Sequence, residues 1–158
     1  MAEALEGFSG SRRRSEIVGE AAGVLVMDDY GHHPTAIRTT LAGLRQFYPG
    51  RRLVVDFMSH TASRTRALLD DFASSFADAD LVVLHRIYPS AREAPDPEMT
   101  GQLLFSKVVA AGAQAVYFDE PVDAVPWLLE ELKPGDLFIT MGAGDNWKVG
   151  VATLDGLG

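Results

Sequence analysis

The segment Asp28–Pro34 concentrates side chains that could do chemistry, with two aspartates, a tyrosine and two histidines in a short stretch. It follows the apolar run Gly23–Met27, which is typical of a buried strand, and Pro34 suits the first position of a helix. Ligands of open α/β sheets bind just beyond the carboxyl ends of strands. We therefore predict that Asp28 lies at the rim of a ligand site, where it could bond a ribose or hold a cation; a turn-capping role is the alternative.

His32 and His33 are neighbours in the chain, so their rings point in different directions at the start of a helix. A single metal ion is therefore not expected to bind both, and we predict no metal site in this chain. One of the two rings should instead cap the helix or pack against it.

Polar residues also follow three other apolar runs. They are Ser59-His60, His85-Arg86 and the segment from Gly142 to Asn146. His60 comes just before a predicted helix start that carries Arg64 and Arg66. These cations and the helix N-terminus could receive a carboxylate or a phosphate, although charges on a solvated first turn are an equally compatible interpretation.

The glycines Gly142 and Gly144 do not make a nucleotide motif by themselves. They lack the spacing of the dinucleotide fingerprint, and no P-loop occurs anywhere in the chain. We expect them to allow a tight turn, and we do not expect this chain to cradle a triphosphate in the usual way.

Five apolar runs alternate with helical patterns along the chain. The runs are Gly23–Met27, Leu53–Phe57, Leu81–Leu84, Ala115–Phe118 and Leu137–Met141. The helical patterns begin at Pro34, at Thr61 or Ser63, at about Glu98 and at Pro121. Nearly unbroken apolar strands are covered on both faces, and the alternation favours right-handed βαβ units. The prediction is an α/β, three-layer domain with a mainly parallel sheet.

Three segments lie outside this alternation. The prolines of Tyr88–Pro97 predict a loop, and Gly150–Gly158 reads as a short or frayed helix. Near the start, Ala2–Gly7 could end a helix, and Arg14–Glu20 could form an edge strand.

Composition narrows the function class. The 158 residues carry a formal net charge of −8, so a nucleic-acid partner is not expected. There is no cysteine, which excludes disulfides and thiolate chemistry. No apolar run approaches the roughly 20 residues of a membrane span, so we expect no membrane partner and a cytoplasmic location.

Three motifs together resemble the third domain of the Mur ligases. They are Asp28-Asp29-Tyr30-Gly31-His32-His33-Pro34-Thr35, the stretch His60…Ser63-Arg64-Thr65-Arg66, and Met141-Gly142-Ala143-Gly144-Asp145. The likeness runs from Phe8 to Gly150 and is closest to the branch that adds L-alanine to UDP-N-acetylmuramate. It implies a Rossmann-like carboxy-terminal domain over residues 21–158, preceded by a connector with an edge strand over residues 1–20.

The resemblance implies an activity for the full-length enzyme in peptidoglycan synthesis. In this family, ATP phosphorylates the muramate carboxylate, and the amino group of the incoming amino acid attacks the acyl phosphate to give ADP and phosphate. ATP and magnesium are bound mainly by a central P-loop domain, and UDP-N-acetylmuramate by an amino-terminal domain. The present chain matches neither, so we expect it to hold no catalytic residue and to be inactive alone.

The resemblance also implies which side chains meet which ligand. The nucleotide side would be formed by Arg13, Asp28, Tyr30 and His32. His60 and Arg64 would meet the incoming amino acid, where a guanidinium could hold its carboxylate. Thr61 stands where relatives commonly have an arginine, so Arg64 would carry more of this recognition.

Three alternatives remain at this point. A related ligase recycles murein tripeptide and has a similar aspartate string, but the Ser63–Arg66 segment follows the alanine-adding pattern. A receiver-like signalling domain would need an aspartate at the end of the third strand and a lysine after the fifth. His85 and Gly142 stand there instead. The third alternative is a stand-alone nucleotide-binding domain without a P-loop.

Overall fold

A six-stranded sheet forms the centre of the computed structural model, which describes residues 14–94 and 96–158. The strand order is β1-β2-β6-β3-β4-β5. The strands are β1 (Glu16–Ala21), β2 (Val24–Asp29), β3 (Leu53–Phe57), β4 (Leu81–Leu84), β5 (Ala115–Tyr117) and β6 (Leu137–Met141). Only β1 runs antiparallel to its neighbour among these strands, and the other pairs are parallel. The predicted edge strand and mainly parallel sheet are confirmed.

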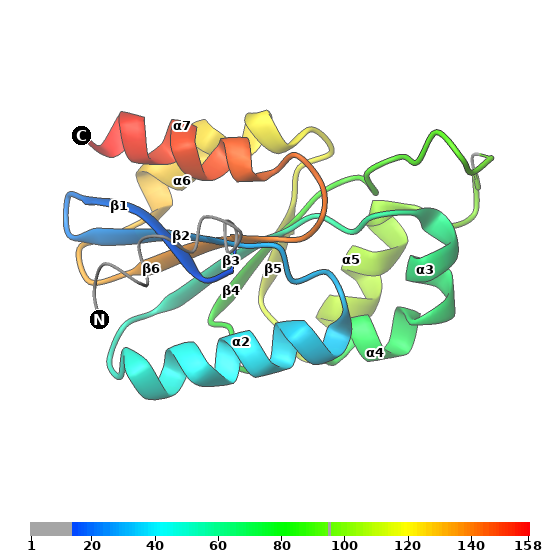
Figure 1. The fold of residues 1–158 in the computed structure, drawn as a ribbon, viewed down its shortest axis with the longest axis horizontal. Helices are drawn as coiled ribbons and strands as arrows, with labels where there is room; N and C mark the ends of the chain where they lie inside the picture. Colours follow the sequence, from blue (N-terminus) through cyan, green and yellow to red (C-terminus); the bar gives the residue numbers. More distant parts are fainter. Residues whose placement is uncertain (1–13, 95) are drawn as a thin grey trace, which may run out of the picture.

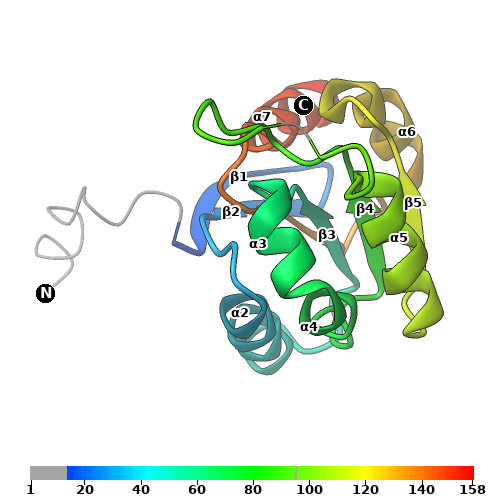
Figure 2. The same cartoon turned by 90° about the vertical axis from the view of Figure 1, so that its right-hand side faces the viewer.

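Helices cover both faces of the sheet, which gives the predicted three layers. The helices are α2 (Pro34–Phe47), α3 (Ala62–Ala67), α4 (Leu69–Ala73), α5 (Gly101–Ala110), the 3-10 turn η2 (Pro121–Asp123), α6 (Ala124–Glu131) and α7 (Trp147–Leu157). Figure 1 shows α6 and α7 above the sheet, with α2, α4 and α5 on the opposite face. Figure 2 shows the same layers with α3 in front, at the edge where the parallel strands end.

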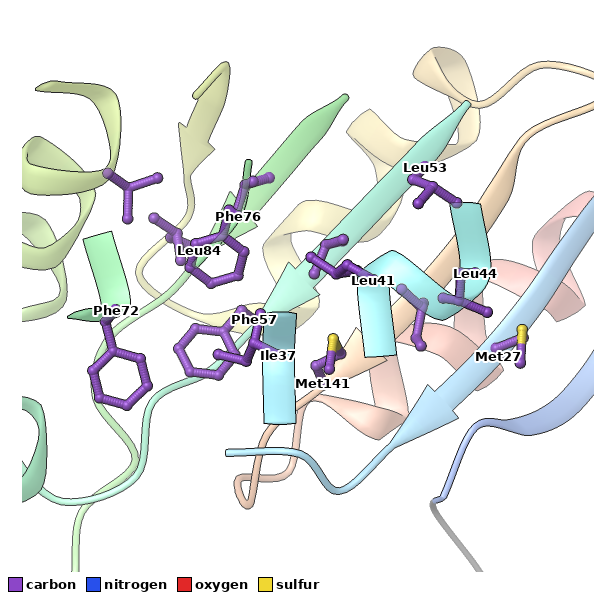
Figure 3. Packing of buried hydrophobic residues seen from close by; sticks show 14 of the residues in the cluster. Met27, Ile37, Leu41, Leu44, Leu53, Phe57, Phe72, Phe76, Leu84 and Met141 are labelled. Atoms are coloured by element: carbon purple, nitrogen blue, oxygen red, sulfur yellow. The ribbon is translucent and has the colours of Figure 1, made fainter. Parts of the chain in front are cut away.

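Two apolar clusters hold the layers together, one on each face of the sheet. On the α2 face, the rings of Phe72 and Phe76 lie 5.6 and 5.3 Å from the ring of Phe57 (Figure 3). Residues Ile37 and Leu41 of α2 are fully buried against the same cluster. The helical spacing of these side chains therefore produced the predicted amphipathic helix.

Helix boundaries differ from the predictions where local contacts override the apolar pattern. The single helix expected from Thr61 or Ser63 to Phe76 is two short helices, because the backbone departs from helical geometry at Leu68 (φ −116°, ψ 20°). Helix α5 begins at Gly101 and not at Glu98, because the Thr100 side chain caps the amide of Leu103.

The ends of the chain partly match the sequence predictions. The carboxy-terminal helix starts at Trp147, three residues before the expected start at Gly150. The expected helix end at Ala2–Gly7 lies outside the described residues.

Candidate functional site

Parallel strands bring the polar strand ends to one edge of the sheet, as predicted. Strands β2, β6, β3 and β4 are successive neighbours, and their carboxyl ends lead to Tyr30, Gly142, Met58 and His85. The loop after β6 packs tightly on the end of β3: a Cβ atom on Gly142, at φ +121°, would lie 2.3 Å from the carbonyl oxygen of Met58. The glycine is therefore required by the close approach of two strand ends.

The sequence predicted that Asp28 lies beyond the end of its strand. In the structure Asp28 lies inside the strand. Strand β2 continues through Asp28 and Asp29, because β6 pairs with it as far as Met141. Asp28 is 4% exposed, and its Oδ1 accepts a 2.7 Å hydrogen bond from the hydroxyl of Thr140. The expected position at an exposed rim is wrong, since the strand is longer than its apolar run.

Asp29 holds Ser15, the residue just before β1, at this edge of the sheet. Sequence reasoning missed this role of Asp29. Its Oδ2 accepts hydrogen bonds from the backbone N–H of Ser15 at 2.7 Å and from the Ser15 hydroxyl at 2.9 Å. Its Oδ1 accepts from the N–H of Gly31 at 2.7 Å. The spacing to Gly31, which allows an Asx turn, was the available sequence signal.

Tyr30 and His32 line an open cavity of about 580 Å³ beside the start of α2. Their rings meet edge to face at a centroid distance of 5.1 Å. Arg14 contributes a cation to the same cavity, whereas the predicted Arg13 lies outside the described residues. The Nδ1 of His33 accepts from the N–H of Thr35 and caps α2, as predicted for one histidine of the pair.

His60 lies just past the end of β3 and packs against Tyr88, with ring centroids 5.7 Å apart. The two residues also form an isolated parallel bridge. Burial, followed by the charges of Arg64 and His32, lowers the pKa of His60 below its ordinary value. Strands β2 and β3, which lead to Tyr30 and to His60, both flank β6, so the two predicted ligand-binding regions lie at the same edge of the sheet.

Thr61 marks local backbone strain at this position. Its φ of +64° lies in the left-handed region, which is rare for a β-branched residue. Strain of this kind costs about 1–3 kcal/mol and is concentrated at functional sites. The strained residue joins His60 to α3, the helix that carries Arg64.

The N-terminus of α3 is already capped by a carboxylate from the proline-rich loop. Glu93 accepts hydrogen bonds from the N–H groups of Ala62 and Ser63, each at 3.0 Å. The expectation that these amides await a ligand anion is therefore wrong. Arg66 is also engaged, because its Nη2 lies 2.7 Å from Oδ2 of Asp96. Arg64 remains exposed, and no ion pair of its side chain occurs within the described part of the chain.

His85 points into the protein instead of toward a ligand. Its Nε2 lies 2.7 Å from Oδ2 of Asp56, and both side chains are fully buried. Asp56 in turn accepts from the side-chain amide of Asn146 at 2.8 Å. Sequence reasoning missed Asp56 because it sits inside an apolar strand.

Neither a metal cluster nor a membrane span occurs in residues 14–94 and 96–158. Within these ranges, no three His, Asp or Glu side chains gather in a way that could hold a metal ion. Nor does any helix there have the length and apolar character needed to cross a membrane.

Comparisons with known proteins agree on one family. A family model described as Mur ligase, glutamate ligase domain, matches residues 13–144. The UDP-N-acetylmuramate–L-alanine ligase of Treponema pallidum (strain Nichols) is 59% identical over 143 residues, which cover 90% of this chain and 30% of that protein. The chain thus spans about a third of the length of such relatives.

Two solved structures have the same fold. The UDP-N-acetylmuramate–alanine ligase of Thermotoga maritima superposes with a TM-score of 0.73 at 25% identity, covering 97% of this chain and 31% of that one. A murein peptide ligase from Psychrobacter arcticus gives a TM-score of 0.72 at 26% identity, covering 99% and 32%.

Proposed function

The chain belongs to the Mur ligase family, as its glutamate ligase domain, and on that premise we propose that it is the carboxy-terminal lid of an ATP-dependent, ADP-forming ligase that adds L-alanine to UDP-N-acetylmuramate. This reaction belongs to peptidoglycan synthesis in the cytoplasm. The amino-terminal and central domains that make up the rest of such relatives would bind UDP-N-acetylmuramate and carry the chemical step. Identity of 59% to an alanine-adding relative supports this choice of substrate.

The observation that carries the proposal is that the residues around Tyr30 and those around His60 both follow strand ends at one edge of the sheet. The open cavity at Tyr30 and His32 has aromatic walls and the cation of Arg14, which suit the base and phosphates of a nucleotide. Asp28 is buried below this region, so we propose that it supports the strand end through Thr140. Asp29 would orient the connector by holding Ser15.

The second region is suited to a small amino acid. Arg64 is exposed at the start of α3, and its charge reaches His60. A guanidinium can hold a carboxylate through two parallel hydrogen bonds. Because Glu93 already occupies the α3 amides, we propose that Arg64 holds the carboxylate of L-alanine, with the neutral ring of His60 beside it. The strand ends that lead to Tyr30 and to His60 flank the end of β6, which supports the closeness of this region to the nucleotide.

The residues of this chain fit a nucleotide better than they fit a magnesium ion. The cavity at Tyr30 could take the adenosine part of ATP, but the described residues contain no cluster of metal ligands. We therefore propose that magnesium and the triphosphate are held mainly by the central domain. ATP would supply the phosphoryl group that activates the muramate carboxylate. The part of this chain would be to hold the adenosine and the amino acid, and to exclude water when the domains close.

The full-length enzyme that contains this chain provides the test. Purified enzyme is mixed with ATP, magnesium and UDP-N-acetylmuramate, and either L-alanine or the murein tripeptide is added as the amino component. We expect ADP release and a new amide product with L-alanine. Product formation only with the tripeptide would replace this proposal by the recycling reaction. Product formation with neither would reject both.

A further inference from the structure

His85 is enclosed by acceptors on both sides of its ring. Its Nε2 lies 2.7 Å from Oδ2 of Asp56, and its Nδ1 lies 2.8 Å from the carbonyl oxygen of Phe118. A carbonyl oxygen only accepts hydrogen bonds, and so does an ionised carboxylate. With Asp56 ionised, both ring nitrogens must donate, and His85 must carry a positive charge.

The surroundings favour this ionised pair over a neutral one. The other carboxylate oxygen of Asp56 accepts a 2.8 Å hydrogen bond from the side-chain amide of Asn146, as an oxygen without a proton does. Burial favours the neutral ring of His85, but the charge and hydrogen bond of Asp56 and the bond to Phe118 outweigh it and raise the pKa. The positive charge of nearby Arg86 acts in the opposite direction, without reversing the net shift.

Asn146 connects this pair to the glycine loop after β6. Its side-chain Nδ2 contacts Oδ1 of Asp56 at 2.8 Å, the carbonyl of Asp56 at 3.1 Å and the carbonyl of Met141 at 3.0 Å. These bonds hold the far end of the loop against Asp56, the last residue but one of β3. Since Asn146 is fully buried, water cannot replace its partners without the loop opening.

The pinned loop rests on the strand end that leads to His60. A Cβ atom on Gly144 would lie 2.8 Å from the sulfur of Met58, and one on Gly142 would lie 2.3 Å from its carbonyl oxygen. Met58 is separated from His60 by Ser59 alone. A shift of the loop would therefore move the backbone that carries His60.

We infer that His85 is a positioning residue: as a buried imidazolium it holds Asp56 and Asn146, and thereby fixes the Gly142–Asn146 loop against Met58, two residues before His60. The link to His60 as an amino-acid contact rests on the proposed function. The protonation state and the loop do not, so they are tested separately.

The first test measures ring protonation in the 158-residue chain by ¹⁵N NMR across a pH series. We expect His85 to carry protons on both nitrogens at neutral pH and to titrate above its ordinary pKa of 6.5, while His60 titrates below it in the same spectra. A single proton on the His85 ring at neutral pH would place the other proton on Asp56 and overturn the inference.

The second test uses Asp56→Asn, which removes the charge but keeps the hydrogen bonds. An asparagine can donate to Nε2 of a neutral His85 and still accept from Asn146. In the wild type, amide protection factors of Gly142–Asn146 should fall as the pH rises through the pKa of His85. In Asp56→Asn this fall should disappear. A loop with the same pH dependence in both proteins would contradict the inference.

The third test links the loop to the substrate, in the full-length enzyme. His85→Phe should lower loop protection and raise the Michaelis constant for L-alanine about tenfold, with kcat and the Michaelis constant for ATP nearly unchanged. An unchanged constant for L-alanine despite a loosened loop would refute the link. If the wild-type enzyme does not use L-alanine, the proposed function fails while the NMR results still decide the role of His85. Should His85→Phe not fold, the pH dependence carries the test: the Michaelis constant of the wild-type enzyme for L-alanine should rise as the pH passes the pKa of His85, and this rise should be absent in Asp56→Asn. The same rise in both enzymes would refute the link.

Discussion

Thr140 and Asp28 face each other on adjacent parallel strands, and the Thr140 hydroxyl donates a 2.7 Å hydrogen bond to Oδ1 of Asp28. Thr140 is fully buried and Asp28 is 4% exposed. A buried polar pair of this kind contributes to stability mainly because loss of either partner removes this hydrogen bond from a place where water does not replace it. Asp28 is thus part of the folded framework of the site.

Replacement of Asp28 by alanine should therefore destabilise the chain. The variant deprives the Thr140 hydroxyl of its carboxylate acceptor and opens a small cavity, so we expect the free energy of unfolding to fall by about 1–3 kcal/mol. Urea denaturation followed by circular dichroism measures this difference. A variant as stable as the wild type would show that the bond contributes nothing.

The matched control is a double-mutant cycle with Thr140→Val. Valine has a similar shape to threonine but no hydroxyl. Thr140→Val therefore removes the hydrogen-bond donor, whereas Asp28→Ala removes the acceptor. The double variant should be less destabilised than the sum of the single variants. Strict additivity would assign the effect of Asp28 to other contacts.

The carboxylate of Glu93 should make the stability of α3 depend on pH. Hydrogen bonds from Ser63, and from the backbone of Ala62, hold the pKa of Glu93 below its ordinary value of 4.5. A carboxylate with a depressed pKa in the folded state stabilises the protein above its unfolded pKa, and this contribution is lost as the pH falls through the folded value. Glu93→Gln should thus be less stable than the wild type at neutral pH, and the difference should vanish in acid.

Thermal unfolding of both proteins over a pH series below 7 checks this prediction. Glu130→Gln on α6 is the control, because Glu130 is exposed on the opposite layer and its replacement removes the same charge. If Glu130→Gln reproduced the pH dependence of Glu93→Gln, general charge effects would account for both.

The sheet and its layers were predictable because their signals are local. Nearly unbroken apolar runs mark strands that helices cover on both faces, and Pro34 marks the start of α2. The strand-end rule also located the edge where the polar residues gather. The length of β2 was not predictable in the same way, because pairing with β6, more than a hundred residues away, decides that Asp28 is inside the strand.

The difference between local and long-range contacts also explains which residues of the site were not predicted from the sequence. Glu93 caps α3 from 30 residues away, and Asp56 meets His85 across 29 residues. Neither pair has a spacing that a sequence pattern could reveal, since both depend on how loops and strands are brought together. The Asp29–Gly31 turn is local and could have been found.

The 158-residue chain alone should not catalyse ligation. The sequence contains no P-loop, and residues 14–94 and 96–158 contain no metal cluster, so we expect no group of these residues to position a triphosphate for transfer. Purified chain with ATP, magnesium, UDP-N-acetylmuramate and L-alanine should release no ADP above the rate of a blank. Sustained ADP release that requires both substrates would overturn the view of this chain as a lid.

Arg64 and Arg66 form a natural pair for the final prediction, because they lie on one short helix and differ in their partners. Arg66 is held by Asp96, whereas Arg64 has no such ion pair within the described residues. In the full-length enzyme, Arg64→Lys keeps the charge but loses bidentate geometry. We expect the Michaelis constant for L-alanine to rise at least about tenfold, with that for ATP nearly unchanged. Arg66→Lys should leave both constants close to the wild type. An equal rise for ATP in Arg64→Lys would move Arg64 to the nucleotide side, and no rise for either substrate would make it a solvated surface charge.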